Sequence, residues 1–209
     1  EAYLEVDGAH YTQAIRACAR ADAWAAAESL LLRARDGGKA LNHFAYSHTI
    51  DAAERANESD VAMRVYGLAL KDGAISHWLE DEPFALDLHG FSEHTAACAV
   101  RYVLRYELGN YIQQDLKIVT GRGKHSLGEP VLLSRIETLL GEELQPPLPY
   151  EMERRLECTS RDCWLNINAG CIVIAMQDLF QWLLETRSFE SYVVKIPSPS
   201  NTDGVFGLE

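Results

Sequence analysis

The sequence has no long apolar stretch and little positive charge. None of its hydrophobic runs approaches the ~18 consecutive apolar residues that a membrane-spanning helix needs, so we expect a soluble chain without a membrane span. Lysine and arginine together number 19 in 209 residues, against 31 aspartates and glutamates, for a formal net charge of −12. Nucleic-acid binders usually carry a basic face, so a nucleic-acid site here must be local.

Paired cysteines are also missing. The five cysteines show no C-x-x-C spacing and form an odd set, which argues against a zinc site and against a complete disulfide framework. We expect them to be buried free thiols in a reducing compartment. At 47% hydrophobic and 24% charged residues, the chain can bury a core and does not have the composition of a disordered tail.

The first third of the chain repeats itself at a shift of 35 residues. Eight of 28 aligned positions are identical, among them Tyr11 with Tyr46, Ile15 with Ile50 and Gly38 with Gly73. Each copy predicts two helices, because apolar residues recur at helical spacing on both sides of a polar turn residue. The predicted helices cover residues 11–21, 24–35, 46–56 and 60–71. Stacked helix pairs of this period form solenoids.

The period, the Tyr-Thr and Tyr-Ser openings and the terminal glycine resemble pentatricopeptide repeats (PPR). In that family one repeat faces one RNA base, which is read by the residue after the opening aromatic and by the last residue of the repeat. By position, the resemblance implies two base-reading pairs, Thr12 with Asn42 and Ser47 with His77. The alternative interpretation is that these are ordinary solvent-facing residues of a helical array.

From residue 84 the pattern alternates between strand and helix. Residues 85–88 predict a buried strand, Ser92 caps the following helix, and residues 116–119 predict a second strand. A glycine-rich loop follows, and Pro130 opens another helix. This order predicts right-handed crossovers and a mainly parallel sheet. Further strands are predicted at 168–174 and 192–196, with a helix containing Trp182 between them.

Polar residues follow both of the first two predicted strands. Ligands of open α/β sheets bind beyond the carboxyl ends of the strands, so we expect Asp87 and His89 to lie beside the loop Gly121-Arg122-Gly123-Lys124. Glycines let backbone N–H groups approach an anion, the two cations neutralise it, and a carboxylate with an imidazole can move protons. A phosphodiester fits these groups. Each motif alone is more often a tight turn, a helix cap or a satisfied polar group than a ligand site, and no P-loop or full G-x-G-x-x-G is present.

The L-D-x-H strand followed by the T-G-x-G-K loop resembles the Small MutS-Related (SMR) domain over residues 84–175. Known members bind structured or branched nucleic acid, and several cleave it. The resemblance implies a catalytic or metal-linked role for Asp87 and His89. It implies phosphate or nucleic-acid contacts for Thr120, Gly121, Arg122, Gly123 and Lys124. Magnesium is the candidate cofactor, and the motifs leave its requirement open.

Repeats followed by such a domain resemble the organellar PPR-SMR proteins. The predicted fold class is α plus α/β, with a short αα-hairpin solenoid over 1–83, an SMR domain with a C-terminal extension over 84–197, and a loop or tail over 198–209. The resemblance implies an RNA-binding protein with endonuclease activity, in a plastid rather than a mitochondrion. The acidic composition keeps a second hypothesis open, a non-catalytic scaffold or accessory subunit of a large organellar complex. DNA is a less favoured partner.

Overall fold

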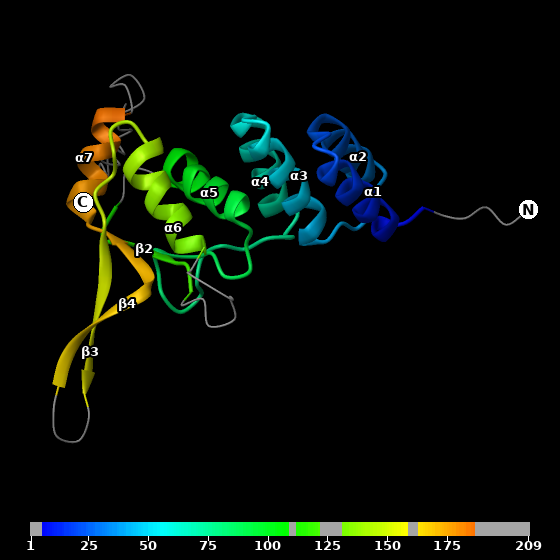
Figure 1. Cartoon of the computed structure of the whole chain (residues 1–209). Coiled ribbons are helices and arrows are strands. Elements are labelled where there is room, and N and C mark those ends of the chain that lie inside the picture. The colour runs from blue at the N-terminus through cyan, green and yellow to red at the C-terminus, as the bar shows by residue number, and fades with distance from the viewer. Residues whose placement is uncertain (1–5, 109–111, 122–130, 159–162, 187–209) are drawn as a thin grey trace, which may run out of the picture.

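The computed structural model describes residues 6–108, 112–121, 131–158 and 163–186 (Figure 1). It begins with four helices of 13 residues each: α1 (Gly8–Arg20), α2 (Trp24–Asp36), α3 (His43–Arg55) and α4 (Ser59–Lys71). They form two successive helix pairs, as the 35-residue repeat predicts, and the predicted bounds are confirmed to within a few residues. Figure 1 shows the pairs side by side at one end of the molecule.

Equivalent residues of the two repeats begin and end these helices. Asp7 and Asn42, which are 35 positions apart, are the N-caps of α1 and α3, and each side chain accepts a hydrogen bond from the backbone N–H three residues later. Left-handed backbone follows each of these four helices, at matching positions of the two repeats. The angle φ is 52° at Asp22, 60° at Asn57, 64° at Gly38 and 68° at Gly73. Such residues stop a helix and turn the chain, so local sequence sets the helix lengths.

A carboxylate near the end of α4 ties the two helix pairs together. Asp72 accepts hydrogen bonds from Arg35 Nε at 2.5 Å and Arg35 Nη2 at 2.9 Å, and also from the hydroxyl of Tyr46. The pKa of Asp72 is lowered to about 2, mainly by the hydrogen bonds that it accepts from Arg35. The repeats are therefore joined by a two-pronged ion pair as well as by apolar packing.

Acid should weaken this junction. Because the folded carboxyl has a pKa of about 2 and an unfolded aspartate one of about 3.9, the stabilisation is complete above pH ~4 and is lost as the pH falls toward 2. We expect Asp72→Asn to lower the free energy of unfolding at neutral pH by about 1 kcal/mol and to flatten its dependence on pH between 4 and 2. Urea denaturation at a series of pH values measures both. Asp36→Asn, on the exposed end of α2, is the control, and an equal acid slope in Asp72→Asn and the unmodified chain would contradict the assignment.

The helical row continues into the second half of the chain. Helix α5 (Glu93–Tyr102) runs into a π-helical segment, η1 (Val103–Glu107), and packs against α3 and α4. Its apolar face is buried, and Ser92 caps it as predicted, accepting a hydrogen bond from the Thr95 N–H at 3.1 Å. Most of the buried apolar residues form one cluster that extends from α1 to α7. The helix pairs and the sheet therefore share a continuous core across the predicted boundary near residue 84.

The sheet has four strands in the order β1-β2-β4-β3, where β1 is Ala85–Asp87, β2 is Leu116–Val119, β3 is Glu151–Cys158 and β4 is Cys163–Ile174. Only β1 and β2 are parallel, and β4 pairs antiparallel with both β2 and β3. The prediction of a mainly parallel sheet is wrong. Four residues separate β3 from β4, which is too short for the crossover that parallel pairing needs, so these two strands can only pair antiparallel.

The remaining helices complete the architecture. Helix α6 (Val131–Thr138), continued by the π-helical segment η2 (Leu139–Glu143), packs beside α5 and against β4, whereas α7 (Met176–Thr186) follows β4 directly (Figure 1). The helix predicted around Trp182 is thus confirmed, and Trp182 packs against the core. Together the described elements are a helical array and a small α/β unit. None of the described helices is long and apolar enough to cross a membrane.

Candidate functional site

Asp87 and His89 lie at the carboxyl end of β1. Asp87 is the last residue of that strand and is aligned with Val119, the last residue of β2. Just beyond it, the Leu88 N–H donates to the Val119 carbonyl at 2.9 Å. Because β1 and β2 are parallel neighbours, their carboxyl ends meet at one edge of the sheet, which is the position predicted for a ligand site.

The carboxylate of Asp87 holds the imidazole of His89. One oxygen, Oδ1, accepts from the His89 backbone N–H at 2.9 Å and lies 2.6 Å from the ring Nδ1. A carboxylate can only accept, so Nδ1 carries a proton in this contact and Nε2 of a neutral ring has a free lone pair. The side chains of His89 and Asp87 are 60% and 32% exposed, so a ligand in solvent can reach both.

Gly121 lies directly against that imidazole. Its φ is +79°, and a Cβ added to it would stand 2.7 Å from His89 Nε2 and 3.0 Å from Cδ2. Only a glycine satisfies both the backbone angle and the close approach. The structure therefore brings together the end of β1 and the start of the glycine-rich loop, as predicted.

Thr120 and Gly121 do not present their backbone amides to a ligand. Both N–H groups donate to the Gly170 carbonyl of β4, at 2.9 and 3.2 Å. Thr120 is 5% exposed, and its Oγ1 is buried with no hydrogen-bond partner among the described residues. The predicted phosphate contacts of this loop would thus have to come from later residues. Arg122, Gly123 and Lys124 lie outside the described residues.

The four predicted base-reading residues have different surroundings. Thr12 is 7% exposed, and its hydroxyl donates to the Gly8 carbonyl at 2.8 Å. Asn42 is exposed but caps α3, and Ser47 is half-buried on the same helix. Thr12 and Asn42 therefore already have structural roles, in the first turns of α1 and α3 respectively.

His77 does not fit the role predicted for it. It is 2% exposed, with Nδ1 2.9 Å from the Tyr66 hydroxyl and Nε2 3.0 Å from the Glu107 carboxylate. Glu107 also accepts from the indole N–H of Trp78 at 2.8 Å. The segment after α4 folds between α4 and η1, which buries this histidine. Its ring nitrogens cannot face an RNA base, and we correct the prediction accordingly.

The described residues do not form a magnesium cage at Asp87. Magnesium prefers several oxygen ligands in octahedral geometry. Here Oδ1 of Asp87 is taken twice by His89, and no group of three His, Cys, Asp or Glu side chains that could hold a metal occurs within the described ranges. The described side chains at the site are thus a carboxylate and an imidazole in contact, a pair that can move a proton.

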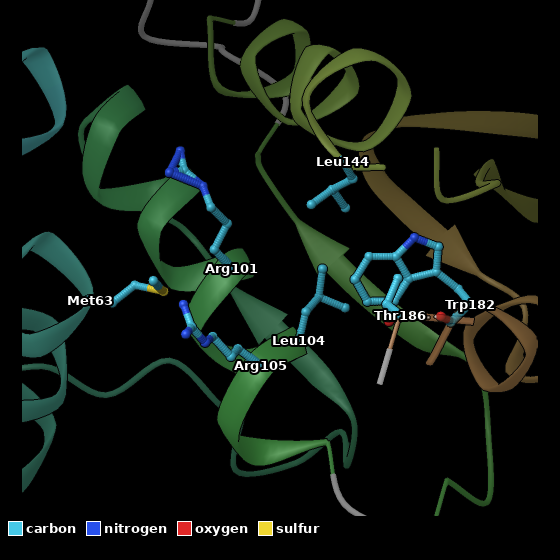
Figure 2. Close-up of a pocket in the computed structure, with 7 residues that line it drawn as sticks. All are labelled: Met63, Arg101, Leu104, Arg105, Leu144, Trp182 and Thr186. Atoms are coloured by element: carbon cyan, nitrogen blue, oxygen red, sulfur yellow. Dashed lines mark hydrogen bonds between the residues drawn. The ribbon is translucent and has the colours of Figure 1, made fainter. Parts of the chain in front are cut away.

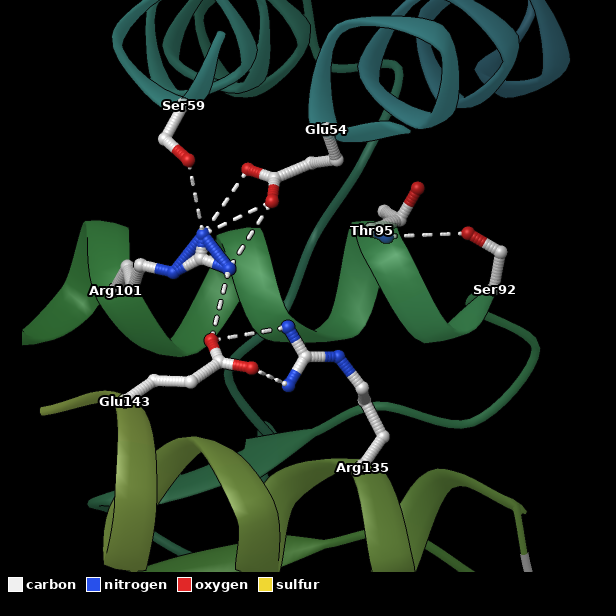
Figure 3. Close-up of polar contacts among 7 residues, drawn as sticks. All are labelled: Glu54, Ser59, Ser92, Thr95, Arg101, Arg135 and Glu143. Carbon is white, nitrogen blue, oxygen red and sulfur yellow. Dashed lines mark hydrogen bonds and ion pairs between the residues drawn. The ribbon is translucent and has the colours of Figure 1, made fainter. Parts of the chain in front are cut away.

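Two carboxylates of the helical array hold the helix that follows the site, and no sequence pattern predicted either of them. Asp51 of α3 accepts from Ser92 Oγ and from Thr95 Oγ1, the latter at 3.2 Å. Glu54, also on α3, binds Arg101 of α5 through both carboxylate oxygens, at 2.9–3.1 Å (Figure 3). Burial raises the pKa of Glu54, and the charge of Arg101 opposes that rise. Since Ser92 follows His89 by three residues, the array anchors the chain next to the site.

We compared the chain with known protein families, curated proteins and solved structures. No protein-family model, no curated protein and no solved structure matches the chain. Any functional assignment then depends on the geometry of the site, in which the Asp87–His89 pair contacts Gly121.

Proposed function

We propose that the chain binds RNA and cleaves its phosphodiester bonds at the Asp87–His89 pair, as an organellar protein of the PPR-SMR type, with a plastid as its compartment. One observation carries the proposal. The imidazole of His89 is held by a carboxylate on one side and faces the first glycine of a Gly-Arg-Gly-Lys loop on the other. A positioned base beside cationic residues is the arrangement that phosphodiester hydrolysis uses.

In this proposal His89 acts as a general base. Its Nε2 takes a proton from a water molecule, whose oxygen forms a new bond to phosphorus while the bond from phosphorus to the leaving oxygen breaks. The imidazolium then returns the proton to the leaving oxygen. Asp87 orients the ring and stabilises its positive charge, as the carboxylate of a catalytic triad does. Arg122 and Lys124 are assigned to the phosphate by their place in the motif.

The acidic charge of the chain supports a second candidate function. A net charge of −12 repels RNA at long range, and the structural roles of Thr12 and His77 weaken base reading by the two repeats. A non-catalytic subunit of a larger assembly would need neither RNA binding nor base reading. Purification of a stoichiometric complex that survives ribonuclease would favour this alternative, whereas strong salt-dependent RNA binding by the chain would favour the first.

A cleavage assay tests the proposal. Labelled single-stranded and structured RNA is incubated with the chain, with and without magnesium, and branched DNA is added as competitor. We expect Asp87→Ala and Lys124→Ala to lower the cleavage rate about a hundred-fold or more. Asp36→Ala and Lys71→Ala, both exposed in the helical array, are the matched controls. Full cleavage by both site variants would remove this site from the mechanism.

A further inference from the structure

Helix α7 carries more apolar side chains than its packing on the rest of the chain buries. Leu179 and Leu183 form its buried side, and they are 0% and 2% exposed. Trp182 lies beside them, and Figure 2 shows its indole directed toward Leu104 and Leu144 across a hollow of about 540 Å³. These residues identify the side of α7 that faces the body of the molecule.

A second row of apolar side chains runs along α7 on a side that is open to solvent. Met176, Phe180 and Leu184 are spaced four residues apart, so they are neighbours on the helix surface. Their exposed fractions are 40%, 51% and 38%. The polar side of the helix is a different one, where Gln181 donates to Glu185 at 2.6 Å. Single exposed apolar residues are ordinary, whereas a row of three beside polar residues marks an interaction surface, which we call the α7 stripe.

The part of the chain that follows α7 has the composition to cover this stripe. Residues 187–209 lie outside the described residues, and they begin where the helix that carries the stripe ends. The sequence predicts a strand over 192–196, Tyr-Val-Val-Lys-Ile. Residues 187–196 contain two cations and one carboxylate, whereas α7 contains two carboxylates and no lysine or arginine. The two segments are therefore complementary in charge, within a chain of net charge −12.

The spacing of the apolar side chains agrees as well. Residues four apart on a helix are separated by about 6 Å along its axis. In an extended strand, residues two apart point to the same side and are separated by about 6.6 Å. Tyr192, Val194 and Ile196 therefore repeat at nearly the spacing of the α7 stripe. Residues 187–191 form a connection of ordinary length for a reversal of the chain.

We propose that residues 192–196 bind the α7 stripe as an extended segment that runs antiparallel to the helix. The facing pairs are Tyr192 with Leu184, Val194 with Phe180, and Ile196 with Met176. Because the segment is tethered directly to the end of α7, its effective concentration at the stripe is high, and a weak contact is enough to keep it bound. The inference goes beyond the proposed function and does not depend on RNA binding or cleavage. A second copy of the chain is the competing occupant.

Trypsin cleavage after Lys195 measures how much of the time the segment is free. The initial rate in the full chain is followed by mass spectrometry and divided by the rate in a free peptide of the same sequence. We expect cleavage in the full chain to be about ten-fold slower, because a protease cuts only the released segment. Phe180→Ser should raise the rate to that of the peptide. Phe44→Ser removes an exposed phenyl ring of α3 and should leave the rate unchanged. Both side chains are more than half exposed, so the variants should fold, and thermal melting checks this.

Two substitutions in the segment itself test the facing pairs. Val194→Ser should raise the normalised rate and Val193→Ser should not, because neighbouring residues of a strand point to opposite sides. Equal rates in these two variants would overturn the proposal, and so would cleavage of the unmodified chain at the rate of the free peptide. Protection that disappears on dilution, together with dimers in light scattering, would assign the stripe to a second copy and overturn it too.

Discussion

Replacing Gly121 with alanine is expected to lower the rate of the proposed RNA cleavage about a hundred-fold, without unfolding the chain. The new Cβ would stand 2.7 Å from His89 Nε2, so the imidazole must move away from its present position. A displacement of about 1 Å is enough to cost this much in rate when a proton-transfer group is misplaced. The measurement is single-turnover cleavage of labelled RNA by equal amounts of folded protein.

A second glycine distinguishes this displacement from backbone strain. Gly38 also has a positive φ, +64°, but a Cβ there would meet nothing within 4 Å. Alanine at either position should lower the free energy of unfolding by about 1–2 kcal/mol, because both then hold an L-residue in left-handed backbone. Only Gly121→Ala should also lose cleavage. If both variants cleave at the full rate, the contact between Gly121 and His89 has no part in the reaction.

Removing Arg101 should produce the largest loss of stability. We expect Arg101→Ala to lower the free energy of unfolding by about 3 kcal/mol or more, since Glu54 would remain buried without its main counter-charge. The Glu54 side chain is 5% exposed and that of Arg101 is 17% exposed (Figure 3). Urea denaturation followed by circular dichroism gives the difference directly.

Two further variants test whether burial is the cause. Arg105→Ala, four residues later, breaks an exposed ion pair with Asp60 and should cost less than about 1 kcal/mol. The double variant Glu54→Leu/Arg101→Met removes both charges at once and should recover most of the lost stability, because no unpaired charge then stays in the interior. A loss in Arg101→Ala no larger than that in Arg105→Ala would contradict the explanation.

Short-range sequence patterns were sufficient to predict the helical array. The 35-residue match placed four helices, and the caps and turns at Asp7, Asn42, Asp22 and Asn57 act through neighbours only a few residues away. The same holds for Ser92 at the start of α5. Local hydrogen bonds and helical periodicity depend little on the rest of the molecule, so a sequence comparison can identify them.

The predictions that failed concern residues whose surroundings come from distant segments of the chain. His77 ends the second repeat by position, yet Tyr66 and Glu107 enclose it. The sheet was predicted to be mainly parallel, but it is mixed, because β4 pairs antiparallel with β2.

Two parts of the site could be identified from the sequence alone: an aspartate and a histidine two residues apart after a predicted strand, and a glycine that follows the next predicted strand. The contact between Gly121 and the imidazole, and the hydrogen bonds from the amides of Thr120 and Gly121 to the Gly170 carbonyl, became visible only in the folded chain. The difference lies in how far apart the partners are along the chain. Asp87 reaches His89 through local backbone geometry, whereas strand pairing alone brings β1, β2 and β4 together.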